Sequence, residues 1–169
     1  MKQLLRTNLA IPWMPKDSEG RLYITDVLPP QEICGTAFGF AFLGDRLLVT
    51  HLKRRGWDIP GGRIEPGETP AQAAVRETWE ETFARVEIVD LIGIQELELF
   101  GPRPENHRWA YPLNTQVFYR CRILELAPFA ANSESLERGL FSPGQVRELP
   151  TIANHDLLYE EALRRVIAS

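Results

Sequence analysis

The stretch Gly61–Ala84 reads GGRIEPGETPAQAAVRETWEETFA and decides how the rest of the chain is interpreted. Its first two residues are glycines, which let a backbone approach a ligand closely. Thr69 and Gln72 match a helix capping box, in which each side chain satisfies the other residue's backbone N–H group. The proline at position 70 suits the first helical position, where no N–H partner is needed. The stretch therefore predicts a glycine-rich loop followed by a helix from about Pro70 to Phe83.

Three acids lie on one side of the predicted helix. Glu77, Glu80 and Glu81 have i, i+3 and i+4 spacing and fall within an arc of roughly 100°. Like charges at this spacing repel each other by about a few tenths of a kcal/mol, and a divalent cation would reverse that cost. Mg²⁺ prefers oxygen ligands, and no histidine or cysteine is interleaved here to favour zinc. The alternative is a solvated acidic face whose charge Arg76 or Arg85 satisfies.

The other residues of this helix are small or apolar. Ala73 and Ala74 lie on the acidic side one turn earlier, where small side chains leave room for a loop or a ligand. Val75, Trp79 and Thr82 lie on the opposite side. We expect that opposite side to bury against a sheet.

The remaining chain consists of apolar segments separated by turns. Strands are expected at residues 21–27, 36–43, 46–52, 86–99, 113–124 and 140–141. Residues 100–112 are expected to form a long loop. Ser142 can cap a brief helix and Asn154 a final one. This order predicts an α/β fold in which helices cover a mixed β-sheet.

Composition excludes several classes of protein. Hydrophobic residues make up 44% and charged residues 25% of the 169 residues, so wholesale disorder is excluded. The net charge of −4 gives no reason to expect a general polyanion-binding surface. No window holds about 18 uninterrupted apolar residues, so no membrane partner is expected. Cys34 and Cys121 lack metal-ligand spacing and are expected to be buried, reduced thiols, which makes the cytoplasm the default location.

The stretch Gly61–Ala84 resembles the Nudix box, the signature of the Nudix hydrolase superfamily. Gly62 opens the pattern, Glu68 follows after five residues, Arg76-Glu77 after seven more, and Glu80-Glu81 completes the acids. Every charged position matches. The preceding residues 57–61, WDIPG, also look like the lead-in that is usual in this family.

Three positions depart from the family pattern. Thr78 takes an apolar position, Phe83 replaces the closing glycine, and Ala84 is a small residue at the last position. Glycine usually supplies the left-handed conformation that ends such a helix, so Phe83 argues against the usual tight turn. The resemblance implies the Nudix fold, a mixed β-sheet sandwiched between α-helices. Residues 36–169 are then the Nudix hydrolase domain, and residues 1–35 are an N-terminal extension packed on it.

The resemblance also implies a chemistry: Nudix hydrolases cleave a phosphoanhydride bond in a nucleoside diphosphate linked to another group, using Mg²⁺ or Mn²⁺. Metal ligands carried over by position are Gly61, through its carbonyl, Glu77, Glu80 and Glu81. Arg76 is implied to orient the acids, together with Glu68. The catalytic residues are thus expected to be Glu68, Arg76, Glu77, Glu80 and Glu81. The general base remains open among a box glutamate, Glu96, Glu98 and Glu105.

Substrate contacts are expected in the loops beside this helix. An arginine can hold a phosphate and an aromatic ring can stack on a base. The candidates are Arg54, Arg55, Arg103, Arg108 and Trp109, and the alternative for Trp109 is packing. His51 and His155 are expected to be structural. No residue identifies the nucleotide.

The expected partner is a small-molecule nucleotide diphosphate derivative, with nucleic acid only as a capped 5′ end. By analogy with relatives, the chain can form a homodimer. Two other classes of function stay open at this point. One is a non-hydrolytic nucleotide-binding or regulatory module, and the other is a metal-free interaction domain.

Overall fold

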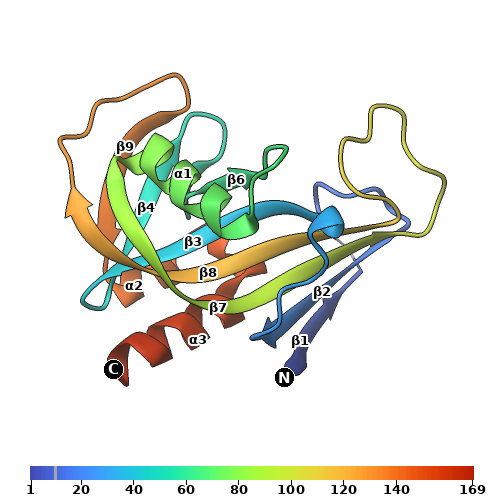
Figure 1. Ribbon diagram of the computed structural model, residues 1–169, viewed down its shortest axis with the longest axis horizontal. Helices are drawn as coiled ribbons and strands as arrows, with labels where there is room; N and C mark the ends of the chain where they lie inside the picture. Colours follow the sequence, from blue (N-terminus) through green and yellow to red (C-terminus); the bar gives the residue numbers. More distant parts are fainter. Residues whose placement is uncertain (10) are drawn as a thin grey trace.

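A single mixed sheet organises the residues that the computed structural model describes, which are 1–9 and 11–169 (Figure 1). Its strands are β1 Lys2–Asn8, β2 Ser18–Thr25, β3 Cys34–Leu43, β4 Arg46–Leu52, β5 Gly56–Asp58, β6 Gly61–Arg63, β7 Ala84–Leu99, β8 Leu113–Leu126 and β9 Ser135–Phe141. The helices are α1 Pro70–Thr82, α2 Pro143–Arg147 and α3 Asp156–Ile167, with 3₁₀ turns at Gln31–Ile33 and Pro150–Asn154.

The strand order is β1-β2-β7-β8-β3-β4-β5, while β6 pairs with β3 and β9 pairs with β4. The β3–β8 pair is parallel, and the other pairs are antiparallel. Helix α1 covers one face of the sheet and α3 the opposite face (Figure 1). The predicted α/β class, with a mixed sheet between helices, is confirmed.

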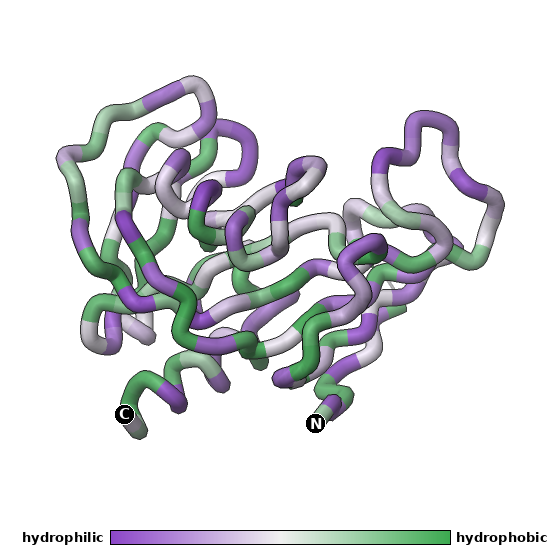
Figure 2. The backbone as a smooth tube through the Cα atoms, viewed as in Figure 1, coloured by the Kyte–Doolittle hydropathy of each residue, from purple (hydrophilic) through white to green (hydrophobic). Residues whose placement is uncertain are grey.

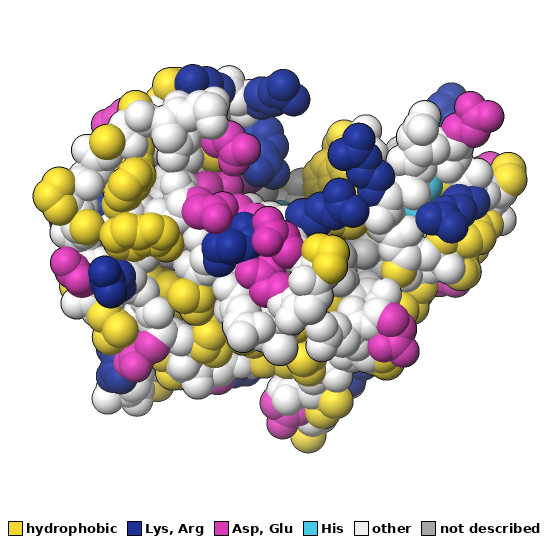
Figure 3. Space-filling model, turned by 45° about the horizontal axis from the view of Figure 1, so that its top comes forward, with side chains coloured by type: hydrophobic (Ala, Val, Ile, Leu, Met, Phe, Trp, Pro, Cys, Tyr) yellow, Lys and Arg dark blue, Asp and Glu magenta, His cyan; other side chains and the backbone are white. Residues whose placement is uncertain are grey.

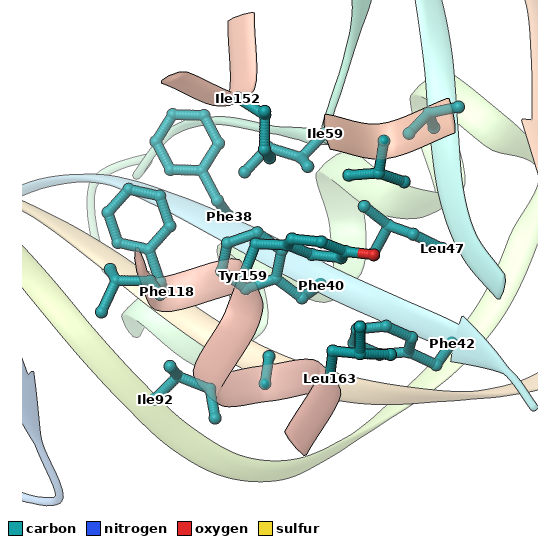
Figure 4. Packing of buried hydrophobic residues seen from close by; sticks show 14 of the residues in the cluster. Phe38, Phe40, Phe42, Leu47, Ile59, Ile92, Phe118, Ile152, Tyr159 and Leu163 are labelled. Atoms are coloured by element: carbon teal, nitrogen blue, oxygen red, sulfur yellow. The ribbon is translucent and has the colours of Figure 1, made fainter. Parts of the chain in front are cut away.

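Side chains alternate between large and small along β3, and this alternation distinguishes the two layers. Phe38, Phe40 and Phe42 point to the face covered by α3, where they pack around Tyr159 (Figure 4). Ala37 and Ala41 point to the opposite face, where α1 lies. A large core therefore forms below the sheet, while α1 can lie close to the strands above it.

A glycine on β3 brings α1 still closer to the sheet. A Cβ atom on Gly39 would lie 3.2 Å from the hydroxyl of Thr78 and 3.2 Å from the sulfur of Cys121. Thr78 is therefore buried against the strands, at the position where the family pattern has an apolar residue. Thr78 donates its hydroxyl to the Ala74 carbonyl oxygen at 2.7 Å, which satisfies it inside the core.

The buried side of α1 differs from our expectation. Ala73, Ala74 and Glu81 are buried against the sheet, whereas Trp79 is 37% exposed. Thr82 is buried as expected. The small alanines pack on the strands instead of leaving space for a ligand, so Glu81 is drawn into the protein and Trp79 is left outside.

Several other elements differ from the sequence predictions. The glycine pair, expected in a loop, belongs to a short strand, β6, that pairs with β3. The first residues form a strand, β1, which we did not expect and which pairs with β2. Strand β9 begins at Ser135, earlier than expected, because it pairs along most of β4. Asn154 ends a 3₁₀ turn and His155 occupies the N-cap of α3 without a side-chain hydrogen bond.

The loop that joins β7 and β8 is mainly hydrophilic and projects from the sheet (Figure 2). Among the helices of the described residues, none has the length and apolar character needed to cross a membrane.

Replacing Gly93 with alanine is expected to destabilise the protein. Its Cβ would lie 2.1 Å from the backbone oxygen of Tyr23, so β7 and β2 would have to separate. We expect the free energy of unfolding, measured by urea denaturation, to fall by about 1–3 kcal/mol. Gly101→Ala is the control, because its Cβ makes only an ordinary contact 3.7 Å from Asp17. Equal stability of the two variants would contradict this account of the β2–β7 contact.

Candidate active site

Helix α1 begins and ends through local interactions of its own sequence. Thr69 accepts a hydrogen bond from the Gln72 backbone at 3.2 Å, and the Gln72 side chain accepts one from the Thr69 backbone at 2.8 Å. The predicted capping box is confirmed. The helix ends at Phe83, which adopts the left-handed conformation with φ 53°. The tight turn is therefore kept without glycine, and the Phe83 ring packs 5.6 Å from both the Trp79 and Phe129 rings.

Arg76 is the centre of a network of charged groups at the start of the site. Its guanidinium binds both oxygens of Glu68, at 2.7 and 3.0 Å, and donates to the Arg63 carbonyl at 2.9 Å. It also contacts Glu77 at 2.9 Å and Glu80 at 3.2 Å. These hydrogen bonds hold the pKa of Glu68 below its ordinary value. Arg76 therefore fixes the loop before the helix to the acids on it.

Glu81 is the most deeply placed acid of the site. Its side chain is buried, and its Oε2 atom has no hydrogen-bond partner. Burial, and next the charge of Glu77, raise the pKa of Glu81 to about 8, although the Gly61 backbone N–H donates to it. A buried carboxyl group with an unpartnered oxygen destabilises the folded protein. A ligand that bonded to this oxygen would remove that cost.

Glu77 lies against the glycine pair. A Cβ atom on Gly62 would come within 2.6 Å of the Glu77 carboxylate, so a side chain at position 62 would displace it. Burial raises the pKa of Glu77 despite its contact with Arg76. Glycine at position 62 is thus required by the close approach of α1 to β6.

The donor set suits a hard cation such as Mg²⁺, because carboxylate oxygens without histidine or cysteine are its preferred ligands. Glu77 and Glu81 lie near each other, and the unpartnered oxygen of Glu81 is available. Glu80 is more exposed and contacts Arg76. Within the described residues, no three His, Cys, Asp or Glu side chains already form a group that could hold a metal ion. Arg76 contacts both Glu77 and Glu80.

A cavity of about 820 Å³ opens beside the glycine pair. Figure 3 shows a hollow in this surface with acidic side chains along one edge and lysine or arginine side chains around it. The cavity is lined by the β1–β2 turn, the glycine pair, the β7–β8 loop, the strands β3 and β8, and the turn before α3. The acids of α1 therefore lie at the side of a space large enough for a nucleotide.

The structure brings only part of the expected substrate-binding set to this cavity. Arg55 and Trp109 line it. Arg54, Arg103 and Arg108 are exposed and are not among its lining residues. These arginines are close to the site in the sequence, but the paths of their loops direct the side chains to solvent.

The three candidate bases outside the helix also lie away from the cavity lining. Glu96 and Glu98 alternate on β7 with Leu97 and Leu99, which line the cavity, so the two acids point to the opposite face. There they pair with Arg21 at 3.1 and 2.8 Å. Glu105 is exposed on the β7–β8 loop.

Sequence reasoning missed several residues of the cavity. Asp58 is buried at its edge, and burial raises the pKa of its carboxyl group. Arg63 lies over the Trp109 ring, 5.3 Å from the ring centroid. Trp13 reaches the cavity from the N-terminal turn. The lead-in WDIPG could have drawn attention to Asp58, but only the tertiary structure reveals Trp13.

A sequence model of the family described as NUDIX domain matches residues 35–163. The chain belongs to the Nudix family. This membership confirms the resemblance that the charged residues of Gly61–Ala84 carry.

Curated Nudix relatives match over short regions. A MutT-like protein of Streptomyces ambofaciens is 46% identical over 50 residues, which are 29% of this chain and 32% of that protein. An RNA pyrophosphohydrolase of Sphingopyxis alaskensis is 33% identical over 85 residues, 48% of this chain and 52% of that protein. The matches thus span about a third to a half of these relatives.

Solved structures of Nudix relatives share the fold over most of the chain. The Bacillus subtilis pyrophosphohydrolase BsRppH has a TM-score of 0.66 at 22% identity and covers 85% of this chain and 89% of that one. An ADP-ribose pyrophosphatase of Streptococcus suis has a TM-score of 0.56 at 24% identity, covering 77% of this chain and 89% of its own. At these identities the likeness shows the fold alone.

His155 is buried at the end of the cavity, as part of the core. Its ring lies 4.8 Å from the Phe118 ring and 6.1 Å from the Phe38 ring. Burial, and next the charge of Arg6, lower its pKa to about 4, although Asp156 acts in the opposite direction. The imidazole is therefore neutral at neutral pH.

The low pKa of His155 predicts a loss of stability in acid. Its unfolded pKa is 6.5, so its contribution is complete above that pH and is lost as the pH falls towards 4. The loss is on the order of 3 kcal/mol. Urea denaturation of the wild type and of His155→Phe at pH values from 7.5 to 4 measures this loss. The loss is the fall in the free energy of unfolding of the wild type minus the fall in that of His155→Phe. Parallel curves would show that His155 does not titrate in this range.

Proposed function

We propose that the protein is a metal-dependent pyrophosphohydrolase that cleaves a phosphoanhydride bond in a nucleoside diphosphate linked to another group. The observation that carries this proposal is the buried carboxylate of Glu81, which lies close to Glu77 and has an oxygen without a partner. An acid that belonged only to a solvated helix face would have no reason to be buried in this way. The name of one sequence relative, an RNA pyrophosphohydrolase, also favours this class of reaction.

The residues that would hold Mg²⁺ or Mn²⁺ are Glu77, Glu80 and Glu81, with the backbone of Gly61. When bound there, such an ion would supply charge neutralisation for the pyrophosphate and activation of a water molecule for attack on phosphorus. Gly61 and Gly62 keep the backbone within reach of the buried Glu81 and the half-buried Glu77, since no side chain separates them.

Arg76 has a positioning role in this proposal. It holds Glu68, Glu77 and Glu80 through one guanidinium, so the repulsion among the acids is partly offset before substrate binds. Arg55 and Arg63 line the cavity and supply positive charge for substrate phosphates. The acids and these two arginines together suit a ligand that is a phosphate chain at one end and an organic group at the other.

The expected location is the cytoplasm. Both cysteines are buried and unpaired, which suits a reducing compartment.

The substitution Glu81→Gln is expected to reduce turnover strongly and to preserve the fold. It keeps the shape of the side chain and removes the negative charge. We expect kcat to fall by about 100-fold or more, equivalent to about 3 kcal/mol of transition-state stabilisation. Glu125→Gln is the control, because Glu125 is exposed and pairs only at the surface with Arg85. Full activity of Glu81→Gln, with an unchanged circular dichroism spectrum, would remove Glu81 from the mechanism.

A hydrolysis panel separates this proposal from a non-hydrolytic module. The protein is incubated with Mg²⁺, Mn²⁺ or EDTA and with nucleoside triphosphates, ADP-ribose, dinucleoside polyphosphates and capped RNA. We expect metal-dependent release of a nucleotide product from at least one of them. Tight binding without any product would favour a regulatory module, and failure to bind either metal or nucleotide would favour an interaction domain.

A further inference from the structure

We propose that the turn between β1 and β2 supplies Trp13 as one wall of a nucleobase site, whose floor recognises N–H donors on the edge of the base. The inference rests on the proposed function, since it assumes that the cavity beside α1 takes a nucleotide. Trp13 lies before residue 35, where the match to the Nudix family begins. The site would therefore be a feature that this chain adds to the family domain.

The turn that carries Trp13 is attached to the sheet at both of its ends. Ile11 is buried, and a Cβ atom on Gly20 would lie only 2.2 Å from its side chain, so Ile11 packs directly on β2. Asp17 accepts a hydrogen bond through its backbone oxygen from the Phe100 N–H at 2.9 Å. This bond joins the turn to the β7–β8 loop, and both loops are thereby held beside the cavity.

Trp13 lies where a ligand bound in the cavity would contact it. It lines the cavity and is still 53% exposed, although the turn beneath it is anchored. Trp109, from the β7–β8 loop, lines the same cavity and is held by the Arg63 guanidinium. Two indole rings at one cavity suit a flat aromatic ligand, because every nucleobase offers a π-face for stacking.

The floor of the cavity contains side-chain oxygens with no hydrogen-bond partner. These atoms are Thr36 Oγ1, Asn114 Oδ1 and Gln116 Oε1. Thr36 and Gln116 are direct neighbours in the parallel pairing of β3 and β8, and all three residues line the cavity. Asn114 is 7% exposed, so its carbonyl oxygen is desolvated as well as unpaired. The amide oxygens of Asn114 and Gln116 are acceptors and call for donors from a ligand, whereas the Thr36 hydroxyl can donate or accept.

Gly35 places Asn114 and Trp109 next to each other. A Cβ atom at this position would lie 2.2 Å from Asn114 Oδ1 and 3.0 Å from the Trp109 ring. The absence of a side chain thus lets an acceptor and an aromatic ring meet at the start of β3. One part of a base could stack on the indole while its edge donates to the floor.

The ligand group that fits is a flat base with adjacent N–H donors on one edge, as in guanine with its ring N–H and amino group. A base without edge donors would stack as well but would leave the amide oxygens of Asn114 and Gln116 unpaired. Sugar and phosphate would extend from the base towards Arg55, Arg63 and the acids of α1. The floor should therefore discriminate by hydrogen bonding, and the tryptophans should add affinity without such discrimination.

The test measures binding without metal or turnover, by isothermal titration calorimetry in EDTA. The probes are GMP, purine riboside 5′-monophosphate, which has no edge donors, and ribose 5-phosphate. We expect GMP to bind at least fivefold more tightly than purine riboside monophosphate, and ribose 5-phosphate to bind weakest. Equal affinity of all three probes would overturn the inference.

Variants assign the two parts of the site. Trp13→Ala is expected to weaken GMP binding at least tenfold, while Trp13→Phe retains it within about threefold. Trp79→Ala is the matched control, because Trp79 is a partly exposed tryptophan on α1 that does not line the cavity. Gln116→Leu is expected to abolish the preference for GMP over purine riboside monophosphate. Unchanged GMP affinity in Trp13→Ala with a native melting temperature would overturn the role of Trp13.

The outcome for this site is separable from that for hydrolysis. An inert protein that binds GMP through Trp13 would refute the proposed reaction and support the base site. An active enzyme whose Trp13→Ala variant keeps the wild-type KM and GMP affinity would do the reverse.

Discussion

The closeness of α1 to the sheet is the constraint on which the site depends. Ala73 and Ala74 on the helix and Gly39 on β3 leave little space between the two layers. The same closeness at the helix end draws Glu81 out of water and sets Glu77 against Gly62. A larger side chain at any of these contacts would lift the helix and return the carboxylates to solvent, where they would behave as ordinary surface acids.

The acids of the site differ in how much positive charge lies next to them. Arg76 partly offsets the charge of the acids that are nearest to the surface, through bonds to Glu68, Glu77 and Glu80. Glu81 lies deeper, without an ion pair to Arg76, and burial raises its pKa to about 8. The site thus combines an outer part held by Arg76 with an inner acid whose ionised form a cation would stabilise most. This gradient fits the metal centre that we propose.

Local sequence signals predicted the features that depend on a few adjacent residues. The capping box of Thr69 and Gln72 involves neighbours in the chain, so no tertiary information was needed to predict it. The orientation of α1 was different. An amphipathic interpretation assigns Trp79 to the core and Glu81 to water, but the short distance to the sheet admits the alanines and Glu81 and leaves the indole ring of Trp79 partly exposed. Phe83 shows a related limit of prediction from sequence. It adopts a backbone conformation that glycine favours, while its ring packs on Trp79 and Phe129.

The backbone hydrogen bond from Phe100 to Asp17 links two loops that are distant in the sequence. A change in the length or path of one loop would break this hydrogen bond and so affect the position of the other loop. Diversification of this cavity among descendants of the chain would favour paired changes in both segments. A chimera that exchanges only one of them with a relative should have a mismatched rim, whereas exchange of both would transplant the rim as a single unit.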